Sequence, residues 1–248
     1  MTRTTVFKMF FSRWLFAGVL SIAVAVPATA GTFSISPLRI ELDRKHSIGV
    51  LTIHNDEDAP LMIETQLVAW SQEGNEEKYL DTHDLLATPP IMQLAPKAEQ
   101  IVRVAIRHVE ASDSELHYRL ILSEVPQKTD KNVNGLSVAL RMNLPVFIAP
   151  AAAAHADLHW QAQWQKDGSL QITATNQGKA HLQIADFSIQ FDGANAVHVN
   201  PSRYVLPGST ITWTVKPPAS IDHHAAMTVH GMSDQGEFSA AVGNADTH

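Results

Sequence analysis

Apolar and polar residues alternate with a period of two along much of this chain after residue 31. Such alternation is typical of strands that bury one face, and short turn clusters separate the segments that carry it. In the first half it predicts strands at 32–42, 47–55, 61–70, 100–107, 116–123 and 136–147. In the second half it predicts strands at 158–165, 170–175, 181–191, 211–216 and 226–232. With no long amphipathic stretch to favour a helix, the pattern indicates an all-β antiparallel sandwich fold.

A proline-rich segment and an alanine-rich segment interrupt this pattern. Thr88-Pro89-Pro90 cannot continue a central strand, so it predicts a corner in which a cis peptide bond can occur. Four alanines at 151–154 follow Pro150 and predict a hinge, with a short helix as the alternative because alanine favours helices. We therefore expect two all-β domains, 31–150 and 151–248.

The first 30 residues have the three-part order of a secretory signal peptide. Arg3, Lys8 and Arg13 are followed by an uncharged apolar stretch that is too short to span a bilayer, and then by Ala28-Thr29-Ala30. Cleavage there leaves 248 − 30 = 218 residues with 15 basic and 25 acidic side chains, a net charge of −10. We expect an exported, periplasmic protein with no membrane insertion after cleavage.

Composition excludes several classes of protein. The chain has no cysteine, which rules out a disulfide scaffold and a thiol nucleophile, and its acidic balance argues against nucleic-acid binding. The 13 histidines include His155 and His159, four apart, but no H-E-x-x-H motif accompanies them. There is no G-x-S-x-G elbow and no glycine-rich phosphate loop. We expect a protein that is not an enzyme and holds no metal and no cofactor, with an exported hydrolase as a remote alternative.

One predicted strand carries an unusually long apolar row. Its apolar side chains occupy every second position: Leu136, Val138, Leu140, Met142 and Leu144. They follow a polar segment at 127–135, and a strand that emerges from such a loop is often at the edge of a sheet. The row has two interpretations, an ordinary core strand or an exposed edge that requires a partner. Burying four such side chains against a partner would contribute roughly 6–12 kcal/mol.

Several segments together resemble the PapD-like periplasmic chaperones of chaperone–usher pili. The resemblance covers most of 33–150, is weaker beyond it, and rests on segments in the family's order at 35–40, 87–96, 101–104, 118–126 and 140–150. Each segment alone would be weak evidence for the family, whereas all of them together, in order and behind a signal peptide, are fairly specific for it. The Pro-Val-Phe ending at 145–147 is similar to that of the non-classical, archaic branch.

The resemblance implies two immunoglobulin-like β-sandwich domains in a boomerang arrangement. In this family the seventh strand of the first domain donates alternating apolar side chains to a pilin that lacks its own last strand. The subunit is then passed to an outer-membrane usher, where the next subunit replaces the donated strand. Leu136, Val138, Leu140, Met142 and Leu144 are the corresponding row here. Self-association in the absence of a subunit is a further expectation.

The family also anchors the terminal carboxylate of the subunit with two basic residues. Its arginine matches Arg39, but its lysine falls at Pro145, so another cation must take that place. Arg141 lies on the same strand with the same parity, and Arg119 is expected on the neighbouring strand. Arginine suits this role because its planar fork can bind both carboxylate oxygens.

Two further matches concern the framework of the protein, one between the domains and one within the first domain. Glu124 matches a glutamate of an interdomain ion triad whose arginine falls at Ala149, so we expect the triad to be broken or rebuilt, with Asp234 left idle. Arg103 matches a structural arginine of the first domain.

The main alternative is a secreted β-sandwich adhesin or receptor-like protein. It would bind carbohydrate or protein through its loops, with Trp160 and Trp164 as a possible aromatic platform. That alternative predicts an aromatic pocket and no donated strand.

Overall fold

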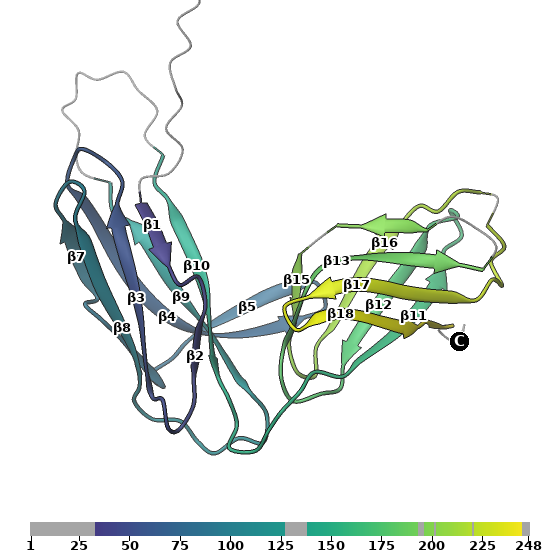
Figure 1. Ribbon diagram of the computed structural model, residues 1–248, viewed down its shortest axis with the longest axis horizontal. Coiled ribbons are helices and arrows are strands. Elements are labelled where there is room, and N and C mark those ends of the chain that lie inside the picture. The colour runs from purple at the N-terminus through teal and green to yellow at the C-terminus, as the bar shows by residue number, and fades with distance from the viewer. Residues whose placement is uncertain (1–32, 127–137, 193–195, 201, 220, 245–248) are drawn as a thin grey trace, which may run out of the picture. The chain divides into compact units, whose positions relative to one another are not determined.

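The computed structural model describes residues 33–126, 138–192, 196–200, 202–219 and 221–244 (Figure 1). All regular secondary structure in these residues is β-strand, which confirms the all-β prediction. The described residues contain no helix that is long and apolar enough to cross a membrane. The predicted signal peptide and Leu136 lie outside them.

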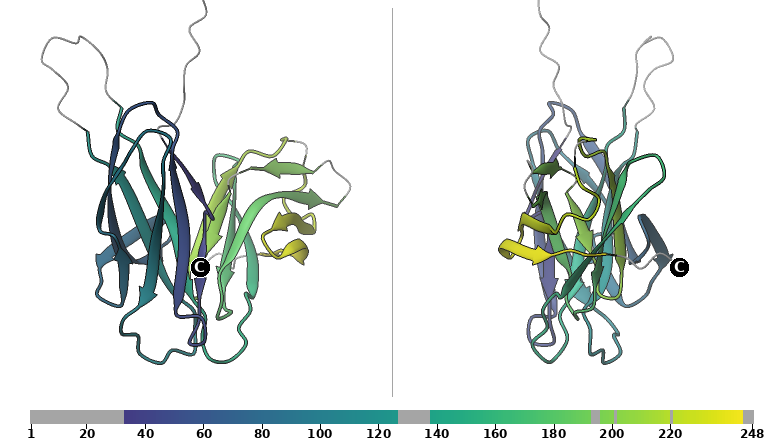
Figure 2. Two further views of the ribbon diagram at one scale, coloured as in Figure 1. Left: turned by 60° about the vertical axis from the view of Figure 1, so that its left-hand side comes forward. Right: turned by 90° about the vertical axis from the view of Figure 1, so that its right-hand side faces the viewer.

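The first β-sandwich is formed by two sheets that stack face to face (Figure 2). One sheet has the order β1 (Phe33–Ser36), β3 (Ile48–Asn55), β8 (Glu99–Ile106) and β6 (Leu85–Thr88). The other has the order β2 (Ile40–Leu42), β10 (Arg141–Ile148), β9 (Leu116–Glu124), β4 (Leu61–Glu73) and β5 (Glu76–Asp81), with β7 (Ile91–Leu94) also paired to β4. The alternating residues of both sheets fill one core, as the sequence pattern requires.

The second β-sandwich has its own core. One sheet has the order β16 (Thr210–Val215), β12 (Leu170–Asn176), β11 (Leu158–Trp164) and β19 (Gly243–Asn244). The other has the order β14 (Val197–Val199), β13 (Leu182–Phe191), β17 (Met227–Ser233) and β18 (Gly236–Ala241), with β15 (Arg203–Val205) also paired to β13. Its interior combines aliphatic side chains with a group of aromatic rings, in which Trp160 stacks on Trp213 with ring centroids 5.8 Å apart.

The structure refines the sequence prediction in several places. Of the strand predicted at 136–147, the described residues 138–140 are not strand, and β10 begins at Arg141. The predicted strand at 32–42 is two strands in different sheets, β1 and β2, because Pro37 lies between them and cannot donate to a ladder. The segment 151–154 is not a helix but an irregular connection between β10 and β11. The short strands β5, β6 and β7 were not predicted. The peptide bond between Thr88 and Pro89 is cis, as expected of that corner.

Candidate functional site

Strand β10 lies at the edge of its sheet for more than half of its length. It pairs antiparallel with β9 from Arg141 to Ile148, but it pairs with β2 only from Val146 to Ile148. Among the described residues, no strand pairs with the outer edge between Arg141 and Pro145. This edge is the first component of the candidate site.

The backbone groups of this edge follow the parity of the β9 ladder. The N–H of Glu124 donates to the carbonyl of Leu140 at 2.9 Å, so even-numbered residues of β10 bond to β9. The N–H and C=O groups of Arg141 and Asn143 therefore point to the open edge. Pro145 has no N–H to offer, so the row of available donors ends just before pairing with β2 begins.

The apolar row runs from β10 back into residues 138–140, which precede the strand and have no regular structure, and it passes from the core to solvent. Leu144 is 3% exposed and belongs to the core of the first sandwich, whereas Leu140 and Met142 are only partly buried against that core. Val138 is 71% exposed. The row thus extends beyond its own sandwich, and Leu144 has no surface left to donate, so we remove it from the candidate set.

Glu124 holds the start of this strand. Its carboxylate Oε2 accepts a hydrogen bond from the N–H of Leu140 at 3.1 Å. This contact lies within the first sandwich. Glu124, whose family counterpart belongs to an interdomain ion triad that we expected to be broken or rebuilt here, thus fixes where the edge begins.

Two arginines flank the position of the missing lysine. Pro145 lies directly opposite Arg119 on β9. Extending the parallel register of β2 and β10 back by one residue aligns Pro145 with Arg39. Residues in one cross-strand row point to the same face. Arg39 and Arg119 therefore lie on the same face, on either side of Pro145.

Arg39 is already paired in the structure. Its Nη1 lies 2.7 Å from Oδ2 of Asp234, and its Nε lies 2.9 Å from Oε1 of Glu41. Burial opposes its charge, but these carboxylates raise the pKa of Arg39 above its ordinary value. Asp234 was expected to have no ion-pair partner. This expectation is wrong, because Asp234 pairs with Arg39, the arginine predicted to anchor the subunit.

Arg119 is the more buried of the two arginines. Its side chain is 9% exposed, its guanidinium lies 3.6 Å from the centroid of the Trp70 ring, and its Nη2 lies 3.1 Å from Oε1 of Glu77. It faces a polar cavity of about 390 Å³ that is also lined by Arg203. The sequence pattern did not single out Arg203, whose Nη1 donates to the carbonyl of Asn75 at 3.1 Å.

The remaining predicted cations lie away from this row. Arg141 is exposed and stands four residues from Pro145 along β10, about 13 Å at the usual strand rise. Arg103 is exposed on the outer face of β8, opposite Val50 of β3, and its guanidinium forms no hydrogen bond or ion pair with the described residues. The described residues also contain no group of three or more side chains placed to hold a metal ion.

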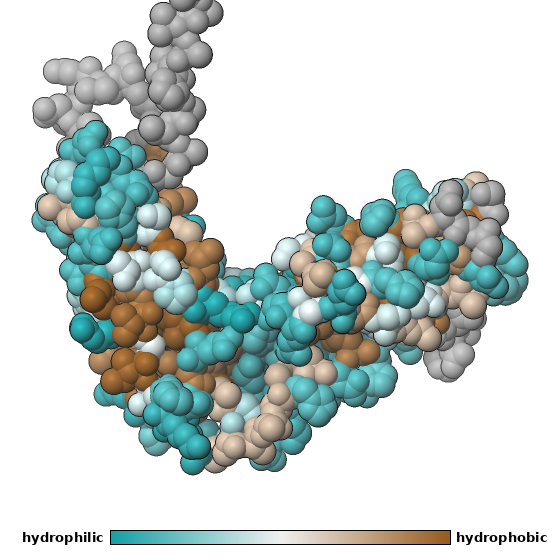
Figure 3. Space-filling view, in the orientation of Figure 1, coloured by the Kyte–Doolittle hydropathy of each residue, from teal (hydrophilic) through white to brown (hydrophobic). Residues whose placement is uncertain are grey.

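A second apolar surface covers the outer face of β3, β8 and β6 (Figure 3). Its exposed side chains are Ile48, Val50, Leu86 and Ile101. This β3–β8 face belongs to the sheet that does not contain β10, so it is separate from the open edge. Contiguous exposed apolar side chains mark interaction surfaces.

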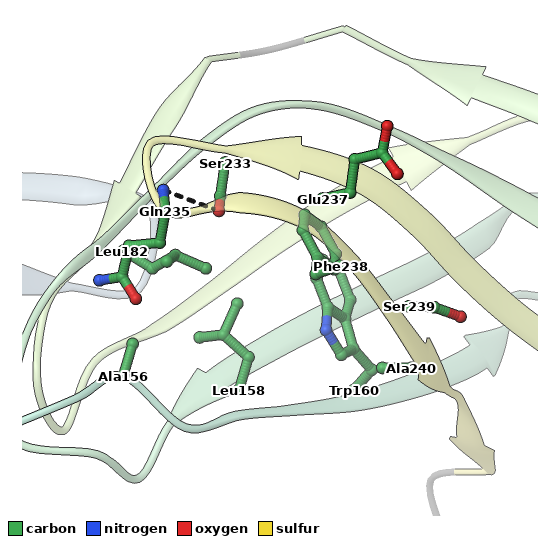
Figure 4. Close-up of a pocket in the computed structure, with 10 residues that line it drawn as sticks. All are labelled: Ala156, Leu158, Trp160, Leu182, Ser233, Gln235, Glu237, Phe238, Ser239 and Ala240. Carbon is green, nitrogen blue, oxygen red and sulfur yellow. Dashed lines mark hydrogen bonds between the residues drawn. The ribbon is translucent and has the colours of Figure 1, made fainter.

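The second sandwich has a cavity of about 320 Å³ beside Trp160 and Phe238 (Figure 4). These rings stack with centroids 6.0 Å apart. Trp160 is only 4% exposed, and Trp164 stacks on His223. The two tryptophans thus pack within the protein and do not present the exposed platform that a carbohydrate-binding adhesin would need.

Comparison with known proteins supports one family. Residues 32–154 match the model described as "Pili and flagellar-assembly chaperone, PapD N-terminal domain". The chain is 26% identical over 136 residues to the uncharacterized fimbrial chaperone YhcA of Escherichia coli K12, covering 54% of this chain and 57% of the relative. It is 30% identical over 123 residues to the chaperone PapD of Escherichia coli, covering 48% and 49%. The chain therefore spans about half the length of these curated relatives.

The fold has solved counterparts over a larger part of the chain. One is the archaic chaperone CsuC of Acinetobacter baumannii, crystallised in a pre-assembly complex with the tip adhesion subunit CsuE of Csu pili. The match has a TM-score of 0.68 and 16% identity, and covers 87% of this chain and all of the other. The immunoglobulin-like sandwiches, the open apolar edge and the matched domain lead to one conclusion: this chain belongs to the PapD-like family of pilus assembly chaperones, whose members are chaperones and not enzymes.

Proposed function

We propose that this protein captures pilus subunits in the periplasm by donor-strand complementation and delivers them to an outer-membrane usher. The observation that carries the proposal is the apolar row of β10 and the preceding residues 138–140. This row leaves its own core between Leu144 and Val138, beside an edge of β10 with which no described strand pairs. CsuC, with the same fold, is recorded in complex with a pilus subunit.

The start of β10 and the residues just before it supply both elements of strand addition. Val138, Leu140 and Met142 would each contribute about 1.5–3 kcal/mol on full burial in a subunit groove, less for the two that are already partly buried. The outward N–H and C=O groups of Arg141 and Asn143 would fix the register of the pairing. Leu136 is part of this proposed row and lies outside the described residues.

The direct test is co-expression with the pilin-like open reading frame that neighbours its gene. A stoichiometric complex should co-purify from the periplasm. Recovery of the chaperone alone, with the subunit degraded or aggregated, would contradict the proposal.

We further propose that Arg39 and Arg119 anchor the terminal carboxylate of the subunit, with Arg119 in place of the family's lysine. Replacing Arg39 by alanine should weaken capture roughly 10-fold to 100-fold, because a charge-assisted hydrogen bond to a carboxylate contributes about 1.5–3 kcal/mol. Its effect on stability should be about 1 kcal/mol or less, because the pair with Asp234 is partly exposed. Capture is measured by co-purification and stability by thermal unfolding.

Arg141→Ala is the matched control, since Arg141 is an exposed arginine in the same region but outside the cross-strand row. It should leave capture within about twofold of the unmodified chain. Equal losses for both variants would remove Arg39 from the anchor.

Delivery to an usher requires a surface that stays free while β10 is occupied. The β3–β8 face meets this requirement because it lies on the other sheet. Replacing Val50 by glutamate should leave subunit capture intact but abolish surface pili, because it places a charge within the apolar face. Stability should change by only about 0.5 kcal/mol, since the position is half exposed and opposite Arg103.

Periplasmic complex and surface pili are measured in the same cells. Leu80→Glu is the control, because Leu80 is an exposed apolar residue of β5 on the other sheet. Normal piliation by the Val50 variant would show that this face has no part in delivery.

A further inference from the structure

A single carboxylate oxygen lies between two cationic groups. Oδ2 of Asp234 is 2.7 Å from Nη1 of Arg39 and 3.5 Å from Nε2 of His181. The other oxygen of Asp234, Oδ1, accepts a hydrogen bond from the N–H of Gln183 at 2.9 Å, which holds the carboxylate in place. Oδ2 is therefore the oxygen that can change partners.

His181 is fixed with one nitrogen directed toward Asp234. Its ring stacks on Phe147 with centroids 3.6 Å apart, and its Nδ1 lies 2.7 Å from Oε1 of Glu115. Its side chain is 8% exposed, and within the described part of the chain its Nε2 has no hydrogen-bond partner. A buried N–H without a partner is costly, so Nε2 would gain a bond if Oδ2 were released by Arg39.

His181 is also the group in this cluster whose charge can change near neutral pH. Burial lowers the pKa of His117 to about 4, so that histidine is neutral above pH 6. Burial would raise the pKa of Asp234, but its interactions with His181, the Gln183 N–H and Arg39 outweigh burial and lower it to about 2. Asp234 is therefore ionised throughout this range.

Arg39 and Tyr204 also keep one charge state between pH 6 and 8.5. Arg39 stays charged, and burial raises the pKa of Tyr204 above its ordinary value of 10, so its phenol stays neutral. Burial lowers the pKa of His181 itself, but Asp234 and Glu115 more than compensate and raise it above 6.5.

We propose that Asp234 occupies Arg39 in the free chaperone as a stand-in for the terminal carboxylate of the subunit, and that His181 receives Asp234 when the subunit displaces it. This inference rests on the proposed function. The exchange leaves no buried charge unpaired, because Arg39 turns to the subunit while Asp234 closes the 3.5 Å gap to His181.

The exchange predicts that capture is linked to proton uptake. Closing that gap stabilises the protonated imidazole, so the complex binds a proton more tightly than the free chaperone does. Affinity for the subunit must then fall as the pH rises through the pKa of His181 in the complex. We therefore expect severalfold weaker capture at pH 8.5 than at pH 6.

The test measures capture of the neighbouring pilin-like subunit, refolded with the purified chaperone, at pH 6, 7 and 8.5. His181→Gln should abolish the pH dependence, because glutamine cannot take up a proton. Asp234→Asn should also be independent of pH and capture at least as well as the unmodified chain at pH 6, because the competitor for Arg39 is gone. His159→Gln is the control, since His159 forms an exposed pair with Asp157 at 3.3 Å.

The outcomes separate the two proposals. The exchange would be overturned if capture by the unmodified chain did not vary with pH. It would also be overturned if capture by the His181 and Asp234 variants varied with pH as much as capture by the unmodified chain. Either result would leave donor-strand capture intact. Absence of capture at every pH would contradict the proposed function and the exchange with it. Thermal unfolding of each variant confirms that it is folded, and if His181→Gln does not fold, Asp234→Asn alone decides.

Discussion

Replacing Leu140 by glutamate is expected to abolish subunit capture while the chaperone remains folded. Leu140 sits at the end of the core, only partly buried, with its neighbour Val138 largely exposed. In the free chain the new carboxylate can turn toward solvent, so stability should fall only modestly. In the complex it would enter an apolar groove, where the lost burial costs about 1.5–3 kcal/mol and the unpaired charge several more.

The expected weakening is therefore about 1000-fold or greater, which should remove the complex from a periplasmic co-purification. Ala139→Glu is the matched control, since Ala139 is the exposed neighbour of opposite parity and its side chain points away from the apolar row. An unfolded Leu140 variant would indicate an ordinary core strand, and unchanged capture would exclude donation by this row.

Replacing Leu144 by alanine is expected to have the largest effect on stability among the described residues of the apolar row. Leu144 shares its face with Leu140 and Val138, but it is 3% exposed within the core of the first sandwich. Truncating a leucine in such a core costs about 2–5 kcal/mol, because the lost transfer free energy is joined by the cost of a cavity. Urea unfolding of the free chaperone measures this loss.

Val138→Ala provides the comparison within the same apolar row. Val138 is 71% exposed, so its truncation should change the free energy of unfolding by about 0.5 kcal/mol or less. Similar losses for the two variants would mean that the free chaperone buries the whole row, and the proposed donor edge would then be closed.

Much of the fold could be predicted because strand periodicity is local. The alternation that marks segments such as 47–55 and 170–175 follows from the two faces of a strand, whatever the strand pairs with. The short strands β5 to β7 could not be recognised in this way. β6 and β7 have four residues each, which is too few to establish a period, and β5 is almost wholly exposed.

The candidate site was predictable in part. The relation of Arg119 to Pro145 follows from strand adjacency, and the structure places them directly opposite each other. The pairing of Arg39 with Asp234 could not be predicted, because 195 residues separate them and no local pattern relates the two. His181 was one of 13 scattered histidines, and nothing near it in the sequence indicates Glu115, 66 residues away.

The sequence by itself determined that this chain is built from strands, that it resembles an exported chaperone, and that one strand carries a long apolar row. Only the tertiary structure decided where that row leaves the core, because Leu144 and Val138 have the same parity and differ only in what packs against them. It also decided which carboxylate holds Arg39. Side-chain direction is a property of the local backbone, whereas burial and ion pairing depend on which distant strands meet.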